Sequence, residues 1–169
     1  MGDQHGSGAG AAVDHVGLSV ADLDAALAWY AAALGWRAAA SFAIDPLGLR
    51  GAFVVSPEGQ AIELLERRGS AGGLRPADPQ EALLTRGYGH VCLRVDDTDA
   101  WHARLLAAGA AERMAPGNAP EPGVRFSFVA DPEGNLIELL DRPHPVGAAV
   151  RGASRTDADA AALQGRLDR

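Results

Sequence analysis

The chain has 169 residues, of which 47% are hydrophobic and 22% are charged, so it can form about one domain with a hydrophobic core. Its formal net charge of −7 excludes a nucleic-acid partner, because affinity for a phosphate backbone depends on clustered cations. All 15 basic residues are arginine, which excludes Schiff-base chemistry on a lysine, and the single cysteine, Cys92, excludes an intrachain disulfide and a multi-cysteine zinc site.

The N-terminal part of the chain predicts an arm followed by a strand. Residues 1–12 are small, polar and rich in glycine, and we expect them to be disordered because they cannot bury enough apolar surface. From residue 13 to residue 20, apolar and polar side chains alternate, as in a half-buried strand. His15 lies on the polar face of this strand, and the residues expected to face the core are Val16, Leu18 and Val20.

A helix and three more strands are predicted to follow. Apolar residues at spacings of three and four predict an amphipathic helix that begins at Asp22 or Asp24 and ends at Gly35. Turn residues then separate three strand-like segments, at about residues 36–43, 49–56 and 61–67. The first unit therefore has the order β-α-β-β-β.

The same order is expected again after a connector. Residues 69–87 are rich in glycine and proline and join the two units, with a short helix predicted at the segment PQEALL. A strand with His90 on its polar face begins the second unit, residues 88–142, and a helix and further strands follow it. In this unit we expect Cys92 to be a small buried packing residue and His102 to lie at the surface.

The last part of the chain, residues 143–169, is alanine-rich and charged and has no counterpart in the first unit. A mobile tail is favoured here over a short helix that contacts another subunit. The sequence has no run of 18 apolar residues and no leader-like segment, so we expect a cytoplasmic protein without a membrane partner.

An internal repeat carries the residues with the most chemical interest. His15 and Glu63 are 48 residues apart, His90 and Glu138 are also 48 apart, and the two pairs are offset by 75 residues. In each IELL segment the flanking residues face the core, so the glutamate projects from the other face of its strand. A carboxylate in that position must be solvated, paired or bound to a cation. Two imidazoles and two carboxylates at matched positions predict a site for one divalent ion, of Ni, Zn, Co, Mn or Fe.

These motifs resemble the vicinal oxygen chelate superfamily, the group of glyoxalases, bleomycin-resistance proteins and extradiol dioxygenases. The resemblance covers about residues 13–142, through DHVGLSV, IELLER, YGHVCLRVDD and DPEGNLIELLDR. It implies an α+β fold of two tandem βαβββ modules whose curved mixed sheets form a cleft. The modules would be residues 13–68 and 88–142 of a single domain, joined by a linker at 69–87. A homodimer is expected because the sheet edges need covering, and the cleft can close within one chain or across the dimer.

Within this superfamily, the order of the four residues is similar to that of glyoxalase I. The resemblance implies that His15, Glu63, His90 and Glu138 bind the metal, and that Glu138 or Glu63 also moves a proton. The implied activity is that of a lyase or isomerase, in which a divalent ion chelates two neighbouring oxygens of a small-molecule substrate and stabilises an enediolate.

The residues around the predicted site leave the substrate open. Glyoxalase I usually has an arginine and an asparagine that serve glutathione at the positions of Ser19 and Arg67, so the thiol cosubstrate is not fixed by the resemblance. Arg94 and Arg125 are the predicted substrate-binding residues, because a guanidinium can hold an anionic group. The alternative for both is an exposed arginine, or one paired with a carboxylate.

Three other activities of the superfamily remain as alternatives. A methylmalonyl-CoA epimerase shares the enolate chemistry, but that family usually has glutamine where Glu63 stands. An extradiol dioxygenase normally holds Fe(II) with two histidines and one glutamate. A metal-free drug-binding protein typically lacks the full set of ligands, and the fold alone does not decide among these functions.

Overall fold

The computed structural model of the protein describes residues 11–145. The arm predicted for residues 1–12 and the tail predicted for residues 143–169 lie outside this range, apart from a few residues at each end. Within residues 11–145, no helix combines the length and the hydropathy that are needed to cross a bilayer.

The first module is a four-stranded sheet with one long helix, in the order predicted from the sequence. The strands lie in the order β1-β4-β3-β2, with β1 parallel to β4 and the other neighbours antiparallel. The elements are β1 (His15–Val20), α1 (Leu23–Leu34), β2 (Arg37–Ile44), the 3-10 turn η1 (Asp45–Leu47), β3 (Leu49–Val55) and β4 (Ala61–Arg67).

The second module repeats this topology, with strand order β5-β8-β7-β6 and β5 parallel to β8. The prediction of an α+β fold with two βαβββ modules is confirmed. The connector carries the short helix α2 (Pro79–Ala82), where a helix was predicted. The remaining elements are β5 (Val91–Arg94), α3 (Thr98–Ala107), β6 (Ala111–Asn118), β7 (Arg125–Ala130) and β8 (Leu136–Asp141).

The two long helices begin in the same way. The Asp22 side chain accepts a hydrogen bond from the backbone N–H of Ala25, and Asp97 accepts one from Ala100, at the equivalent point of the second module. Both contacts satisfy an N–H group that the first turn of a helix leaves without a partner. The first helix ends at Gly35 with a φ of 73°, a left-handed conformation that glycine adopts without strain. Asp22, rather than Asp24, is therefore the N-cap.

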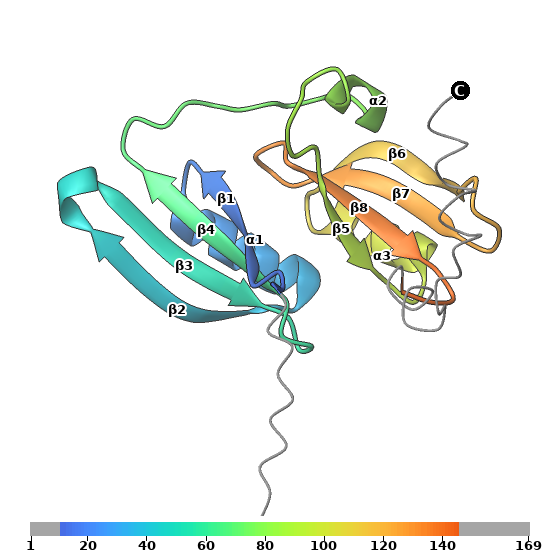
Figure 1. Ribbon diagram of the computed structural model, residues 1–169, viewed down its shortest axis with the longest axis horizontal. Coiled ribbons are helices and arrows are strands. Elements are labelled where there is room, and N and C mark those ends of the chain that lie inside the picture. The colour runs from blue at the N-terminus through green and yellow to red at the C-terminus, as the bar shows by residue number, and fades with distance from the viewer. Residues whose placement is uncertain (1–10, 146–169) are drawn as a thin grey trace, which may run out of the picture.

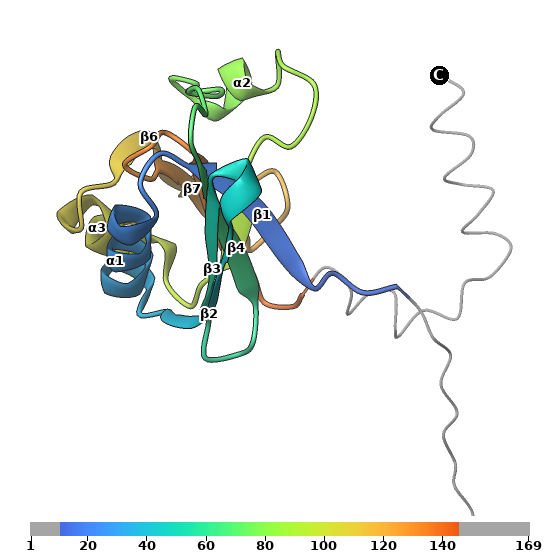
Figure 2. The same cartoon turned by 90° about the vertical axis from the view of Figure 1, so that its left-hand side faces the viewer.

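The two modules share one hydrophobic core on the side of the helices. Figure 2 shows α1 and α3 together on one side of the sheets, and Figure 1 shows the two sheets side by side with β1 and β5 at their facing edges. Residues of both modules form one buried cluster, which includes Leu64 and Leu139. Trp29 also donates a hydrogen bond of 2.9 Å to the carbonyl of Ala108 across the modules. No helix within residues 11–145 covers the opposite faces of the sheets.

Tertiary packing overrides the strand and helix patterns at two positions. Val16, predicted to face the core, is 44% exposed, because it lies on the edge strand β1 and lines the cavity between β1 and β5. His102, predicted at the surface, is only 4% exposed, and its Nε2 lies 2.9 Å from a carboxylate oxygen of Glu112 on β6. The surface prediction for His102 was wrong because α3 packs against β6 and β7 through this part of the helix.

Candidate metal site

His15 and Glu63 lie together on the open face of the first sheet. Strand β1 pairs with β4 so that Gly17 is opposite Glu63, and His15 lies two residues before Gly17 on the same face. The imidazole Nε2 of His15 is 3.5 Å from a carboxylate oxygen of Glu63. Both side chains are about one-third exposed or less, at 35% and 20%. One nitrogen and one carboxylate oxygen are thus presented together to the open face.

His90 and Glu138 repeat this arrangement on the second sheet. Cys92 is opposite Glu138 in the pairing of β5 with β8, and His90 lies two residues before Cys92. The Nε2 atom of His90 is 3.1 Å from a carboxylate oxygen of Glu138. The second pair has nearly the same exposure as the first, at 37% for His90 and 17% for Glu138. The structure therefore brings the four predicted ligands together as two equivalent pairs.

A phenylalanine supports each histidine in the same geometry. Phe53 is opposite Glu63 in the sheet, and its ring meets that of His15 edge to face with centroids 5.3 Å apart. Phe128 is opposite Glu138 and meets His90 in the same way at 5.2 Å. Such contacts favour one orientation of the imidazole and keep apolar surface beside it. The sequence analysis missed these two residues, although the same 75-residue offset separates them.

Asp14 distinguishes the first pair from the second. Its carboxylate lies 2.8 Å from Nδ1 of His15, so it can accept the Nδ1 proton and leave Nε2 free to face Glu63. This hydrogen bond, with the nearby charges of Glu63 and Asp14, raises the pKa of His15 above its usual value despite some desolvation. The second module has Gly89 at the equivalent position. Only His15 therefore has an aspartate to set its tautomer.

The position opposite each glutamate also differs between the modules. In the first module, Gly17 leaves space beside Glu63, since an added Cβ would lie 3.6 Å from the carboxylate. In the second module, Cys92 occupies this position, on the exposed side of its strand rather than buried as predicted. Partial desolvation, followed by the charge and hydrogen bond of Glu138, raises the pKa of Cys92 to about 12. Glu138 therefore has a thiol beside it, whereas Glu63 has a glycine at the equivalent position.

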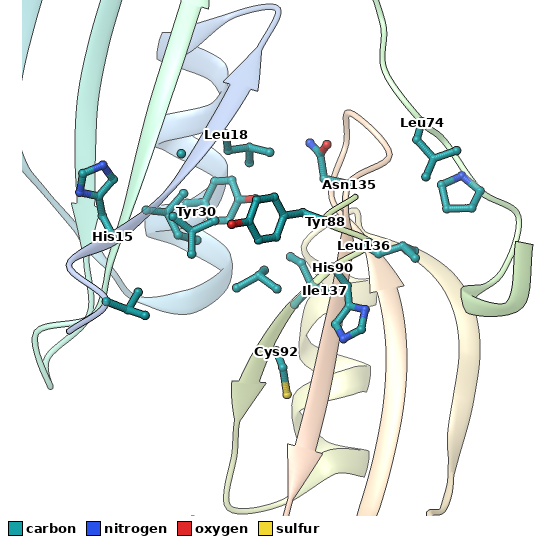
Figure 3. A pocket seen from close by; sticks show the side chains of 17 residues that line it. His15, Leu18, Tyr30, Leu74, Tyr88, His90, Cys92, Asn135, Leu136 and Ile137 are labelled. Carbon is teal, nitrogen blue, oxygen red and sulfur yellow. The ribbon is translucent and has the colours of Figure 1, made fainter. Parts of the chain in front are cut away.

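The two pairs do not meet within one chain. Among residues 11–145, no three His, Cys, Asp or Glu side chains lie close enough together to hold a metal ion. A cavity of about 650 Å³ lies between β1 and β5, and Figure 3 shows His15 and His90 on opposite sides of it. Tyr30 and Tyr88 lie between them. The described residues thus contain two separate pairs, each with one histidine and one glutamate; if they hold a metal, each pair is a half-site.

The two predicted substrate-binding arginines are in different surroundings. Arg94 is exposed at the end of β5 and shares the face of Cys92 and Glu138. Arg125 is on the opposite, helix-covered face, because the neighbouring Phe126 and Phe128 point to the open face. Its guanidinium donates to Asp99 on α3, and Asp99 in turn holds the pKa of Arg125 above its usual value.

This ion pair of Arg125 has an equivalent in the first module, where Arg50 donates to Asp24 on α1 at 3.0 Å and to Glu66 at 2.8 Å. Both arginines therefore join a helix to the sheet that it covers. The sheet lies between the side chains of Arg125 and Glu138. Arg125 is therefore not on the face where a substrate at Glu138 would lie, although it was predicted to bind substrate.

Comparison with known proteins identifies the family and the fold. Residues 12–139 match the family model described as the glyoxalase/bleomycin resistance protein/dioxygenase superfamily. None of the curated proteins matches the chain in sequence.

Several solved structures have the same fold. Glyoxalase I from Zea mays is 22% identical with a TM-score of 0.63, and the match covers 78% of this chain but only 44% of the maize chain. A glyoxylase/bleomycin resistance protein/dioxygenase domain from Frankia sp. EAN1pec is 25% identical with a TM-score of 0.63, covering 81% of this chain and 96% of the other. The trypanothione-dependent glyoxalase I of Leishmania major is 23% identical with a TM-score of 0.59, covering 78% and 87%. The chain thus spans less than half of the maize protein.

Proposed function

Because the chain belongs to the glyoxalase/bleomycin resistance protein/dioxygenase superfamily, we propose that it is a metal-dependent lyase or isomerase of the glyoxalase I type. One divalent ion, of Ni, Zn, Co, Mn or Fe, would be held by His15, Glu63, His90 and Glu138. The observation that carries this proposal is the repetition of one His–Glu pair on the open faces of two equivalent sheets. The distance from the histidine Nε2 to a carboxylate oxygen of the glutamate is 3.5 Å in the first pair and 3.1 Å in the second. Imidazole nitrogen and carboxylate oxygen suit these borderline divalent ions.

The proposed site is completed by a second copy of the chain. Two protein ligands are fewer than the three or four that hold catalytic divalent ions in most proteins, so one half-site alone is insufficient. We propose a homodimer in which the His15–Glu63 pair of one chain faces the His90–Glu138 pair of its partner. Apolar side chains exposed beside the half-sites support this arrangement, because a partner would remove them from water. They are Val13, Val16 and Tyr88, at 87%, 44% and 106% exposure.

The chain's own residues supply positioning and a base. When bound, a divalent ion would polarise two neighbouring oxygens of the substrate and stabilise negative charge on them. We assign proton transfer between adjacent carbons to Glu63, with Glu138 as the alternative, because the residue opposite Glu63 is Gly17, which has no side chain, whereas the residue opposite Glu138 is Cys92. Phe53 and Phe128 would keep water away from the imidazoles.

The proposed substrate is a small molecule with two adjacent oxygens, acted on in the cytoplasm. Arg94 is the better placed of the two predicted anchoring arginines, because it shares the open face with Glu138 and forms no ion pair with any residue between 11 and 145. Arg125 keeps its predicted role only if its contact with Asp99 exchanges for one with substrate. A turnover assay should identify the thiol cosubstrate. It should compare hemithioacetals of several thiols with acyl-CoA epimers as substrates.

A complementation experiment tests the site and the dimer together. Glu63→Gln and Glu138→Gln chains are purified separately, each inactive, and are then co-refolded. If the site forms across the dimer, half of the dimers are mixed and each contains one intact site, so about a quarter of the wild-type activity should return. A site within one chain would give no recovery, because every chain lacks one ligand. Failure of the wild-type protein to bind Ni, Zn, Co, Mn or Fe would refute the enzyme proposal.

A further inference from the structure

Strand β2 forms the outer edge of the first sheet and is exposed along its whole length (Figure 1). All eight of its residues, Arg37–Ile44, are exposed. Helix α1 lies mainly over β3 and β4, and it leaves a groove of about 610 Å³ beside β2. In the second module, α3 also lies over the edge strand β6, where His102 of the helix contacts Glu112. The outward backbone N–H and C=O groups of β2 therefore have no neighbouring strand within residues 11–145.

The sequence protects the edge of the second sheet but not the edge of the first. Charged residues, proline and irregular pairing all hinder the addition of another strand to an edge. Strand β6 contains Arg113 and Pro116, and its pairing with β7 is interrupted twice. At the equivalent positions, 75 residues earlier, β2 has Ala38 and Ser41. The pairing of β2 with β3 is interrupted once, and residues 38–44 include no charge and no proline.

The charges at the two ends of β2 complement each other. Arg37 begins the strand, and Asp45 directly follows its last residue. Both side chains are exposed, and neither forms an ion pair with any residue between 11 and 145. If two copies of β2 pair antiparallel about a two-fold axis, the Arg37 end of each strand lies beside the Asp45 end of the other. Each end of the pairing then joins a guanidinium to a carboxylate, and the middle carries no charge that would repel a second copy.

We infer that β2 pairs antiparallel with β2 of a second copy of the chain, so that the first sheets of two chains form one continuous sheet. The two-fold axis passes close to Ser41, midway between Arg37 and Asp45. Apolar side chains along the strand favour a contact over exposure to water, since Phe42 and Ile44 are 36% and 42% exposed. This contact uses the backbone edge of the sheet rather than its open face, so it does not depend on the proposed function.

Charge reversal tests this pairing through the mass of the assembly. Sedimentation equilibrium of the full-length chain over a range of protein concentrations gives the mass and the dissociation constant. Arg37→Asp places two carboxylates at each end of the pairing, and Asp45→Arg places two guanidinium groups there. Each variant should halve the mass and weaken association by about tenfold or more. The double variant, Arg37→Asp with Asp45→Arg, reverses each ion pair and should restore the wild-type mass.

Two further variants separate the edge from the rest of the surface. Glu58→Arg is the matched control for Asp45→Arg, because Glu58 is an exposed carboxylate in the turn between β3 and β4, and it should leave the mass unchanged. Ala40→Lys places a charge within the strand and should halve the mass. A monomeric wild-type chain, or a mass that neither charge reversal lowers, would overturn the inference and leave the edge to another protein or to residues 146–169. Failure of the double variant to restore the mass would also overturn it, because the two charges would then act without pairing.

Discussion

The hydrogen bond between Tyr30 and Asp131 joins the two modules and can be removed by one substitution. The Tyr30 hydroxyl on α1 donates to Asp131 at 3.0 Å, and both residues are nearly inaccessible to solvent, at 2% and 4%. A hydrogen bond to a charged acceptor contributes about 1.5–3 kcal/mol. Asp131 also accepts hydrogen bonds from the backbone of Glu133 and from the backbone and side chain of Asn135, so its carboxylate keeps other donors. We therefore expect Tyr30→Phe to lower the free energy of unfolding by about 1.5 kcal/mol, at the lower end of this range.

Thermal and denaturant unfolding of wild type and Tyr30→Phe check this value. For a chain of this size, about 1.5 kcal/mol corresponds to a decrease in Tm of roughly 3–6 °C. Tyr88→Phe is the matched control, because it keeps the apolar ring and removes only a hydroxyl that forms no hydrogen bond with any residue between 11 and 145, so the Tm should stay unchanged. A decrease below about 0.5 kcal/mol in Tyr30→Phe would refute the view that this contact stabilises the modules against one another.

The same hydrogen bond predicts a dependence of stability on alkaline pH. Burial raises the pKa of Tyr30, and the charge and hydrogen bond of Asp131 raise it further. In the folded protein Tyr30 therefore keeps its proton at a pH where the unfolded chain, with a tyrosine pKa of about 10, loses it. Stability should be retained below pH 10 and should fall as the pH rises beyond it, and this fall should be smaller in Tyr30→Phe.

Three further predictions concern the site. Glu63→Gln and Glu138→Gln should each weaken binding of a divalent ion by at least about tenfold, measured by calorimetry, because each removes a proposed ligand; unchanged affinity in either would remove that residue from the site. Asp14→Asn should shift the pH midpoint of metal binding downward, because the pKa of His15 then falls and protons compete less with the metal at a given pH. An upward shift would show instead that Asp14 acts mainly by orienting the imidazole. Arg125→Ala should change stability little, as for other exposed ion pairs, and should leave KM unchanged, whereas a raised KM would support its predicted contact with substrate.

Features that depend on local geometry could be predicted from the sequence. The cap at Asp22 and the end of the helix at Gly35 follow from the backbone groups of a single turn. The placement of His15 and Glu63 on one face follows from the alternation of side chains in a strand. The repeat then extended both results to the second module, since equivalent sequences form equivalent pairs.

Features that depend on the packing of different elements against one another could not be predicted in this way. The exposure of Val16 depends on the gap between β1 and β5, and the burial of His102 depends on contacts with β6 and β7. Neither appears in the periodicity of a single element. The ion pair of Arg125 is a different case. Side chains alternate along β7, so Arg125 lies on the same face as Ser127 and Val129, and this alternation already indicated the helix-covered face.

The separation of the two half-sites follows from how the modules are joined. Each sheet has one apolar face, and α1 and α3 cover these faces within a single core that includes Leu105 and Tyr30. Because the helices occupy the shared side, both polar faces are left open, with β1 and β5 at the facing edges. With the two helices in one shared core, the His–Glu pairs of one chain therefore lie on separate open faces. The proposed four-ligand site would then take its second pair from another copy of the chain.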